Sequence, residues 1–78
     1  MQFMNNVLQI RKMLGMTQEA LGSELGCNQS NVGHYENGRQ KVPVHVALKL
    51  VDLAKMRGHE LSLDDIYRPA EMISPSSP

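Results

Sequence analysis

The stretch TQEALGSELGCNQSNVGHYENGR, Thr17 to Arg39, decides the fold of this chain. It contains two segments with apolar residues at helical spacing, separated by a break at Gly26. Thr17 and Asn28 each stand where a helix N-cap belongs, and Asn37-Gly38 ends the second segment at about Glu36. The stretch therefore predicts two short helices joined by a tight turn.

A glycine interrupts each predicted helix, Gly22 in the first and Gly33 in the second. Each costs a helix interior up to about 1 kcal/mol relative to alanine. Where the second helix crosses the first at a steep angle, a side chain at Gly22 would stand between the backbones. The small and apolar positions fit a helix-turn-helix; those expected to pack inward are Ala20, Leu21, Leu25, Cys27, Val32 and Tyr35.

The predicted second helix has a polar, uncharged outward face. Because Val32 and Tyr35 define its inward side, the opposite side carries Ser30, Gly33, His34 and Asn37, with Gln29 on the flank. In a helix-turn-helix the second helix enters the major groove, where Gln pairs with adenine and Ser bonds several bases. Gly33 flattens this face, so we expect the helix to seat close to the bases.

The rest of the chain predicts three further helices and no strand. They run over 4–14, ended by Gly15, over 43–57 with Pro43 as its first residue and Gly58 as its end, and over 62–67, capped by Ser62. The predicted fold class is all-α, a compact bundle of about five short helices over residues 1–67, with the motif at about 17–37. Residues 68–78 are rich in Pro and Ser and predict a disordered tail.

Composition limits the possible functions. Eight Lys and Arg balance eight Asp and Glu, so any contact with nucleic acid must depend on the local placement of charge. Cys27 is the single cysteine, no apolar run is long enough for a membrane span, and no signal peptide is recognisable, which favours a cytoplasmic protein. No metal-ligand or catalytic constellation stands out, so we expect neither an enzyme nor a cofactor, metal or small-molecule ligand.

The stretch MTQEALGSELGCNQSNVGHYENGR resembles the helix-turn-helix of the lambdoid phage Cro and repressor proteins, within the lambda-repressor-like family. The similarity covers roughly Val7 to Tyr67 and is sharpest from Met16 to Gly38. It implies a transcriptional regulator that occupies operator DNA overlapping a promoter. Nothing resembles the cleavage and oligomerisation domain of full-length phage repressors, so the chain is most similar to a Cro protein.

The resemblance also implies roles for particular residues. Bases would be contacted by Gln29, Ser30, Asn31 and His34. Phosphates would be contacted by Thr17, Gln18, Asn28, Asn37, Arg39 and Lys41. Glu36, at the end of the recognition helix, would pair with Arg11 of the first helix, which fits the need of a core-side carboxylate for a partner.

The predicted fourth helix is apolar around most of its circumference, whereas a helix covering a small core needs only one apolar stripe. The surplus predicts a homodimer with Val46, Leu50 and Leu53 at its interface. A dimer would place two recognition helices about one DNA turn apart on a near-palindromic operator.

Two other interpretations fit the same residues. An antitoxin-type regulator would bind both DNA and a protein partner, with the apolar fourth helix and the tail serving that partner. A helical protein-interaction module would use the motif as scaffold only, and the zero net charge is the feature in its favour.

Overall fold

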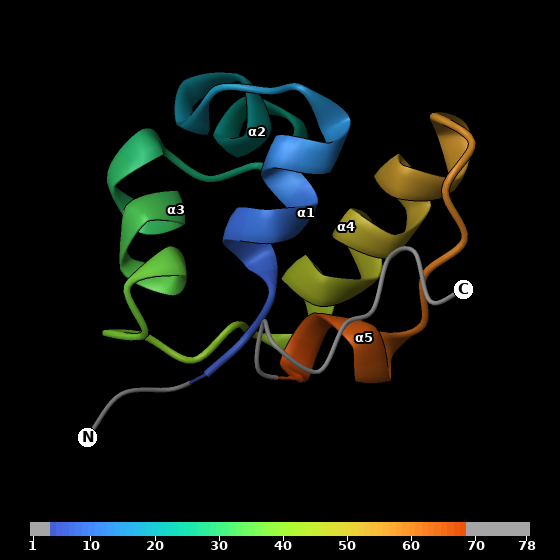
Figure 1. Cartoon of the computed structure of the whole chain (residues 1–78). Coiled ribbons are helices and arrows are strands. Elements are labelled where there is room, and N and C mark those ends of the chain that lie inside the picture. The colour runs from blue at the N-terminus through green and yellow to red at the C-terminus, as the bar shows by residue number, and fades with distance from the viewer. Residues whose placement is uncertain (1–3, 69–78) are drawn as a thin grey trace.

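The computed structural model describes residues 4–68 of the chain (Figure 1). This part holds five α-helices and no strand, which confirms the predicted all-α fold. The helices are α1 Val7–Leu14, α2 Gln18–Leu25, α3 Gln29–Glu36, α4 Val44–Met56 and α5 Leu63–Tyr67. The Pro- and Ser-rich segment for which a disordered tail is predicted lies outside the described residues, apart from Arg68.

All five helices and the α3–α4 connection contribute to one apolar core. Helix α4 packs against both α2 and α5, and α3 packs against α1 and α2 (Figure 1). Burial of this apolar surface is the main source of stability, since each fully buried aliphatic side chain contributes about 1.5–3 kcal/mol. The core consists of Val7, Ile10, Leu14, Leu21, Leu25, Val32, Tyr35, Val42, Val46, Ala47, Leu50, Leu53, Ala54 and Ile66.

Helix α1 begins at Val7, three residues later than the sequence predicts. The side-chain oxygen of Asn5 accepts a hydrogen bond from the Val7 amide, and the helix begins at Val7. Asn6 is fully buried and is bonded to the other end of the domain: its amide nitrogen Nδ2 donates to the carbonyls of Asp65 and Arg68, 2.8 Å each. Asn6, directly before α1, therefore binds the backbone of α5 and does not extend α1.

Two more helix starts are defined by their caps. Pro43 is the N-cap of α4 and not its first residue, because its ψ of 151° is extended although its φ of −64° suits a helix. Ser62 caps α5 as predicted, in a capping box with Asp65. Helix α4 ends in a Schellman motif, in which His59 N donates to Ala54 O and Gly58 takes a φ of +89°.

The interface predicted for a homodimer is wrong. Val46, Leu50 and Leu53 are 4%, 0% and 8% exposed, because α4 is covered by other helices of the same chain on more than one side. Its apolar circumference is therefore used mostly within the monomer. The apolar side chains that α4 leaves well exposed are Val44, Leu48 and Met56.

One inward position of the motif is also corrected. Ala20 is exposed, whereas Leu21 and Leu25 on the same helix are buried, because the apolar stripe of α2 is narrower than predicted. Among residues 4–68, no helix has the length and apolar character needed to cross a membrane.

Candidate nucleic-acid interface

The connection between α2 and α3 is a tight turn that requires glycine at two places. Gly26 has a φ of +78°, a conformation that other residues rarely adopt. Cys27 N donates to the Gly22 carbonyl over 2.8 Å, which folds the turn back onto α2. A Cβ atom at Gly22 would lie 2.7 Å from the Cys27 carbonyl oxygen and 3.1 Å from that of Asn28. Gly22 thus makes room for the backbone of the turn, and not for the crossing helix as the sequence predicts.

Both helices of the motif have side-chain N-caps at the predicted residues. Thr17 Oγ1 accepts from Ala20 N over 3.0 Å, and Asn28 Oδ1 accepts from Asn31 N over 2.8 Å. Both capping residues are exposed. Capping uses only their acceptor oxygens, so the Thr17 hydroxyl hydrogen and the Asn28 amide hydrogens stay available as donors. Each helix therefore presents donors at its N-terminus, where the helix dipole favours an anion.

The outward side of α3 is polar and accessible, as predicted. Gln29, Ser30 and Asn37 are exposed, and Asn31, Gly33 and His34 are partly exposed. Val32 and Tyr35 face inward, 0% and 5% exposed. A Cβ atom at Gly33 would contact only Gln18 Nε2, at an ordinary 3.6 Å. Packing within the chain therefore does not require glycine at Gly33.

A network of charge-assisted and amide hydrogen bonds connects this face to α1 and α2. Arg11 and Glu36 form the ion pair that the resemblance implies, through Arg11 Nε to Glu36 Oε2 at 2.5 Å. Arg11 also donates to the Met16 carbonyl over 3.0 Å. Gln18 Nε2 donates to Glu36 Oε1 over 2.9 Å, and Gln29 Nε2 donates to Gln18 Oε1 over 3.4 Å. The network thus extends from a partly buried ion pair to the first residue of α3.

The role of Gln18 in this network is not visible in the sequence. Gln18 and Gln29 are each the first residue of a helix, and no local periodicity relates them. They meet because α2 packs against α3, so that the Gln18 side chain lies along α3 and reaches residues at both of its ends. A further contact of the same kind joins Asn5 Nδ2 to the Tyr35 carbonyl over 2.8 Å, across the end of α3.

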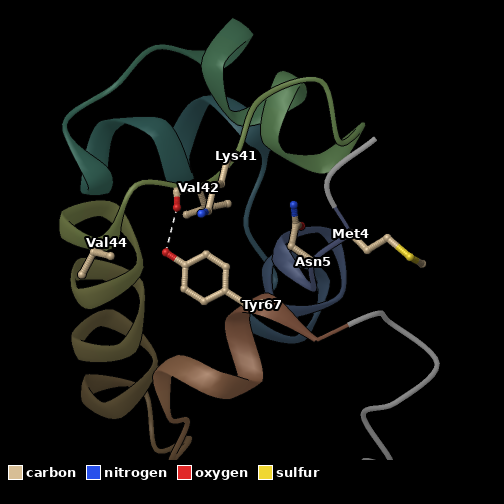
Figure 2. Close-up of a pocket in the computed structure, with 6 residues that line it drawn as sticks. All are labelled: Met4, Asn5, Lys41, Val42, Val44 and Tyr67. Atoms are coloured by element: carbon tan, nitrogen blue, oxygen red, sulfur yellow. Dashed lines mark hydrogen bonds between the residues drawn. The ribbon is translucent and has the colours of Figure 1, made fainter. Parts of the chain in front are cut away.

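The segment after α3 carries the basic residues predicted to meet phosphates. Asn37, Arg39 and Lys41 are all exposed. Lys41 also lines a hollow of about 440 Å³, together with Met4, Asn5, Val42, Val44 and Tyr67 (Figure 2). The Tyr67 hydroxyl donates to the Val42 carbonyl over 2.7 Å, which fixes this wall of the hollow (Figure 2).

Burial shifts the pKa of two groups near the turn, the Cys27 thiol and the Tyr35 phenol. Burial raises the pKa of the Cys27 thiol above its ordinary 9.0, and the ammonium of Lys49 opposes that rise. Burial also raises the pKa of the Tyr35 phenol, with a smaller effect from Cys27. Both groups are therefore neutral near pH 7. Within the described part of the chain, no cluster of three or more His, Cys, Asp or Glu residues could hold a metal ion.

A family model described as a helix-turn-helix domain matches residues 8–63, which include the motif, its polar network and most of the core. The chain belongs to this helix-turn-helix domain family and is a helix-turn-helix DNA-binding protein. No curated protein and no solved structure matches the chain.

Proposed function

We propose that this protein is a sequence-specific DNA-binding transcriptional regulator, a repressor of the phage Cro and repressor type. It would bind a near-palindromic operator as a homodimer, with α3 in the major groove, and exclude polymerase without catalysis or a cofactor. The observation that carries this proposal is the exposed polar side of α3, held in place by the network that runs from Arg11 to Gln29.

Gln29 is suited to read adenine. The bond to Gln18 uses one hydrogen of its Nε2 and leaves the second hydrogen and the Oε1 acceptor free. These two groups match the N7 acceptor and the N6 donor that adenine presents in the major groove. Because Gln18 accepts the other hydrogen, the side-chain amide of Gln29 is held in one of its two orientations. This arrangement favours adenine before DNA arrives, and preorganisation of this kind increases affinity.

The phosphate contacts would lie on both sides of the exposed polar side of α3. We call this side the reading face; it carries Gln29, Ser30, Gly33, His34 and Asn37. Thr17, Gln18 and Asn28 stand at the starts of α2 and α3, and Arg39 and Lys41 follow the end of α3. Such contacts position the protein on the duplex but carry no sequence information. Arg39 and Lys41 would give a chain of zero net charge a local positive charge on this side.

The homodimer needs a surface other than the buried side chains of α4. Two copies on one duplex must meet beside the surface that faces the phosphates. The hollow next to Lys41 has this position, and two of its lining side chains, Met4 and Val44, are apolar and 60% and 58% exposed. Leu48 is 49% exposed and lies one turn further along α4. A second copy seated here would cover these side chains.

Binding-site selection from a random duplex pool tests the proposal. We expect a near-palindromic winner, with a steep salt dependence for both specific and scrambled duplexes and a large gap between their affinities. Gln29→Ala should cost about 1–3 kcal/mol at one base pair of each half-site and relax the preference there.

The matched control is Gln9→Ala, which changes an exposed glutamine of α1 that makes no described side-chain hydrogen bond. It should leave the selected site and the affinity unchanged. If the wild-type protein enriches no site, the motif is a scaffold for protein interaction and the proposal fails.

A further inference from the structure

His34 lies in the middle of the reading face of α3, about one turn beyond Ser30, and is partly exposed. Its backbone carbonyl accepts bonds from Arg39 N and Gln40 N, which close the end of the helix. Its imidazole makes no hydrogen bond to any of residues 4–68. By contrast, Gln29 on the same helix is already bonded to Gln18. His34 therefore brings an unused hydrogen-bonding group to this face.

Helix geometry directs His34 to a different base pair from the one under Gln29. The five residues from Gln29 to His34 rise by about 7.5 Å along the helix axis. Successive base pairs are about 3.4 Å apart. Gly33 adds no side chain beside His34, and a Cβ there would contact only Gln18 Nε2. The imidazole therefore has one side-chain neighbour fewer on this face than it would have with any other residue at Gly33.

Base chemistry selects the partner. An imidazole carries at least one N–H in every protonation state. In the major groove guanine presents only acceptors, N7 and O6, whereas adenine places an amino donor beside its N7 and thymine a methyl group beside its O4. Cytosine presents an amino donor. A side chain that donates and is not bound elsewhere thus meets fewest mismatched groups at guanine.

We propose that His34 specifies a guanine in each half-site, at a base pair separate from the one that Gln29 reads. This inference depends on the proposed function, because it assigns a base to the same DNA-reading face. Helix α3 would then read an adenine through Gln29 and a guanine through His34, although it has no lysine or arginine, the side chains that most often contact guanine.

The test is parallel site selection with the wild-type protein, His34→Ala and His34→Gln. The wild type should select a G·C pair at one half-site position and should lose roughly tenfold in affinity when that pair becomes A·T. His34→Ala should lose the preference at that position alone, and His34→Gln should change it to A·T. His45→Ala, which alters an exposed histidine of α4, is the matched control and should leave the whole site unchanged.

The outcomes separate this inference from the proposed function. If the wild type selects a site but His34→Ala selects the same one with equal stringency, or if the position is A·T in the wild type, the assignment of His34 is wrong while the regulator remains. If the wild type selects nothing, the proposed function and the inference fail together. Far-ultraviolet circular dichroism confirms that each variant is folded.

Discussion

Gln18 donates a hydrogen bond to Glu36, from Nε2 to Oε1 over 2.9 Å, and so joins the first residue of α2 to the last residue of α3. Since Glu36 can only accept, the amide nitrogen of Gln18 must face it and the amide oxygen must face Gln29. The Arg11–Glu36 ion pair thus fixes the orientation of the Gln18 side chain, which in turn accepts a hydrogen bond from Gln29. A structural ion pair and the side chain proposed to read a base therefore belong to one network.

Removing the cation of that pair should destabilise the domain. The Glu36 side chain is 5% exposed and that of Arg11 17% exposed, so Arg11→Met leaves a nearly buried carboxylate without its charge partner. We expect a loss of about 2–4 kcal/mol in the free energy of unfolding, measured by urea titration at pH 7. The control is Asp64→Asn, which weakens the exposed Arg68–Asp64 pair and should cost less than about 1 kcal/mol. Equal effects of the two changes would contradict the structural role of the Arg11 pair.

Replacing each of the two helix-interior glycines by alanine should have opposite effects on the free energy of unfolding. Gly22→Ala places a methyl group 2.7 Å from a backbone oxygen of the turn and should cost about 1–3 kcal/mol of stability. Gly33→Ala meets no such contact and should stabilise the fold by up to about 1 kcal/mol, through helix propensity. If α3 seats close to the bases, the same Gly33→Ala change should weaken operator binding. Thermal unfolding and a binding titration on each variant test both effects, and a destabilised Gly33→Ala variant would contradict this account.

Substitutions at exposed and at buried apolar residues of α4 should have different effects: the first should impair dimer formation, and the second should impair folding. Val44→Glu changes a 58% exposed side chain, so the variant should remain folded but shift from dimer to monomer in analytical ultracentrifugation. Leu53→Glu buries a carboxylate in the core, where an unpaired charge is costly, and should unfold the chain. A Val44→Glu variant that remains dimeric would place the contact between copies elsewhere.

Stability should decline at alkaline pH because of the turn cysteine. Burial raises the pKa of Cys27 above 9.0 in the folded chain, so the unfolded chain releases its proton first as pH rises. The contribution of the protonated Cys27 thiol to the free energy of unfolding is therefore complete below about pH 9 and is lost as the pH rises above it. Urea midpoints between pH 7 and pH 10 should fall with rising pH, and Cys27→Ala should reduce that slope. The slope should not vanish at the upper end, because the pKa of Tyr35 is also raised.

The sequence alone determined the motif and the five helices, apart from the starts of α1 and α4, because local chemistry sets them. Thr17, Asn28 and Ser62 cap helices through their own side chains, and Gly26 ends a helix through its own backbone. The spacing of Val32 and Tyr35 likewise identified the inward side of α3. The Arg11–Glu36 pair came from the family resemblance, since no local rule relates residues that far apart in the chain.

Only the tertiary structure decided which apolar residues of α4 are buried within the chain and which are left exposed. Periodicity indicates how much of a helix is apolar, but the number of neighbours that cover it depends on the packing of the whole chain. Val46, Leu50 and Leu53 were therefore predicted to meet a partner, although their side of α4 is covered by other helices of the same chain. The packing also brought Gln18 to Gln29 and bonded Asn6 to α5, because contacts between distant residues arise only when the helices dock.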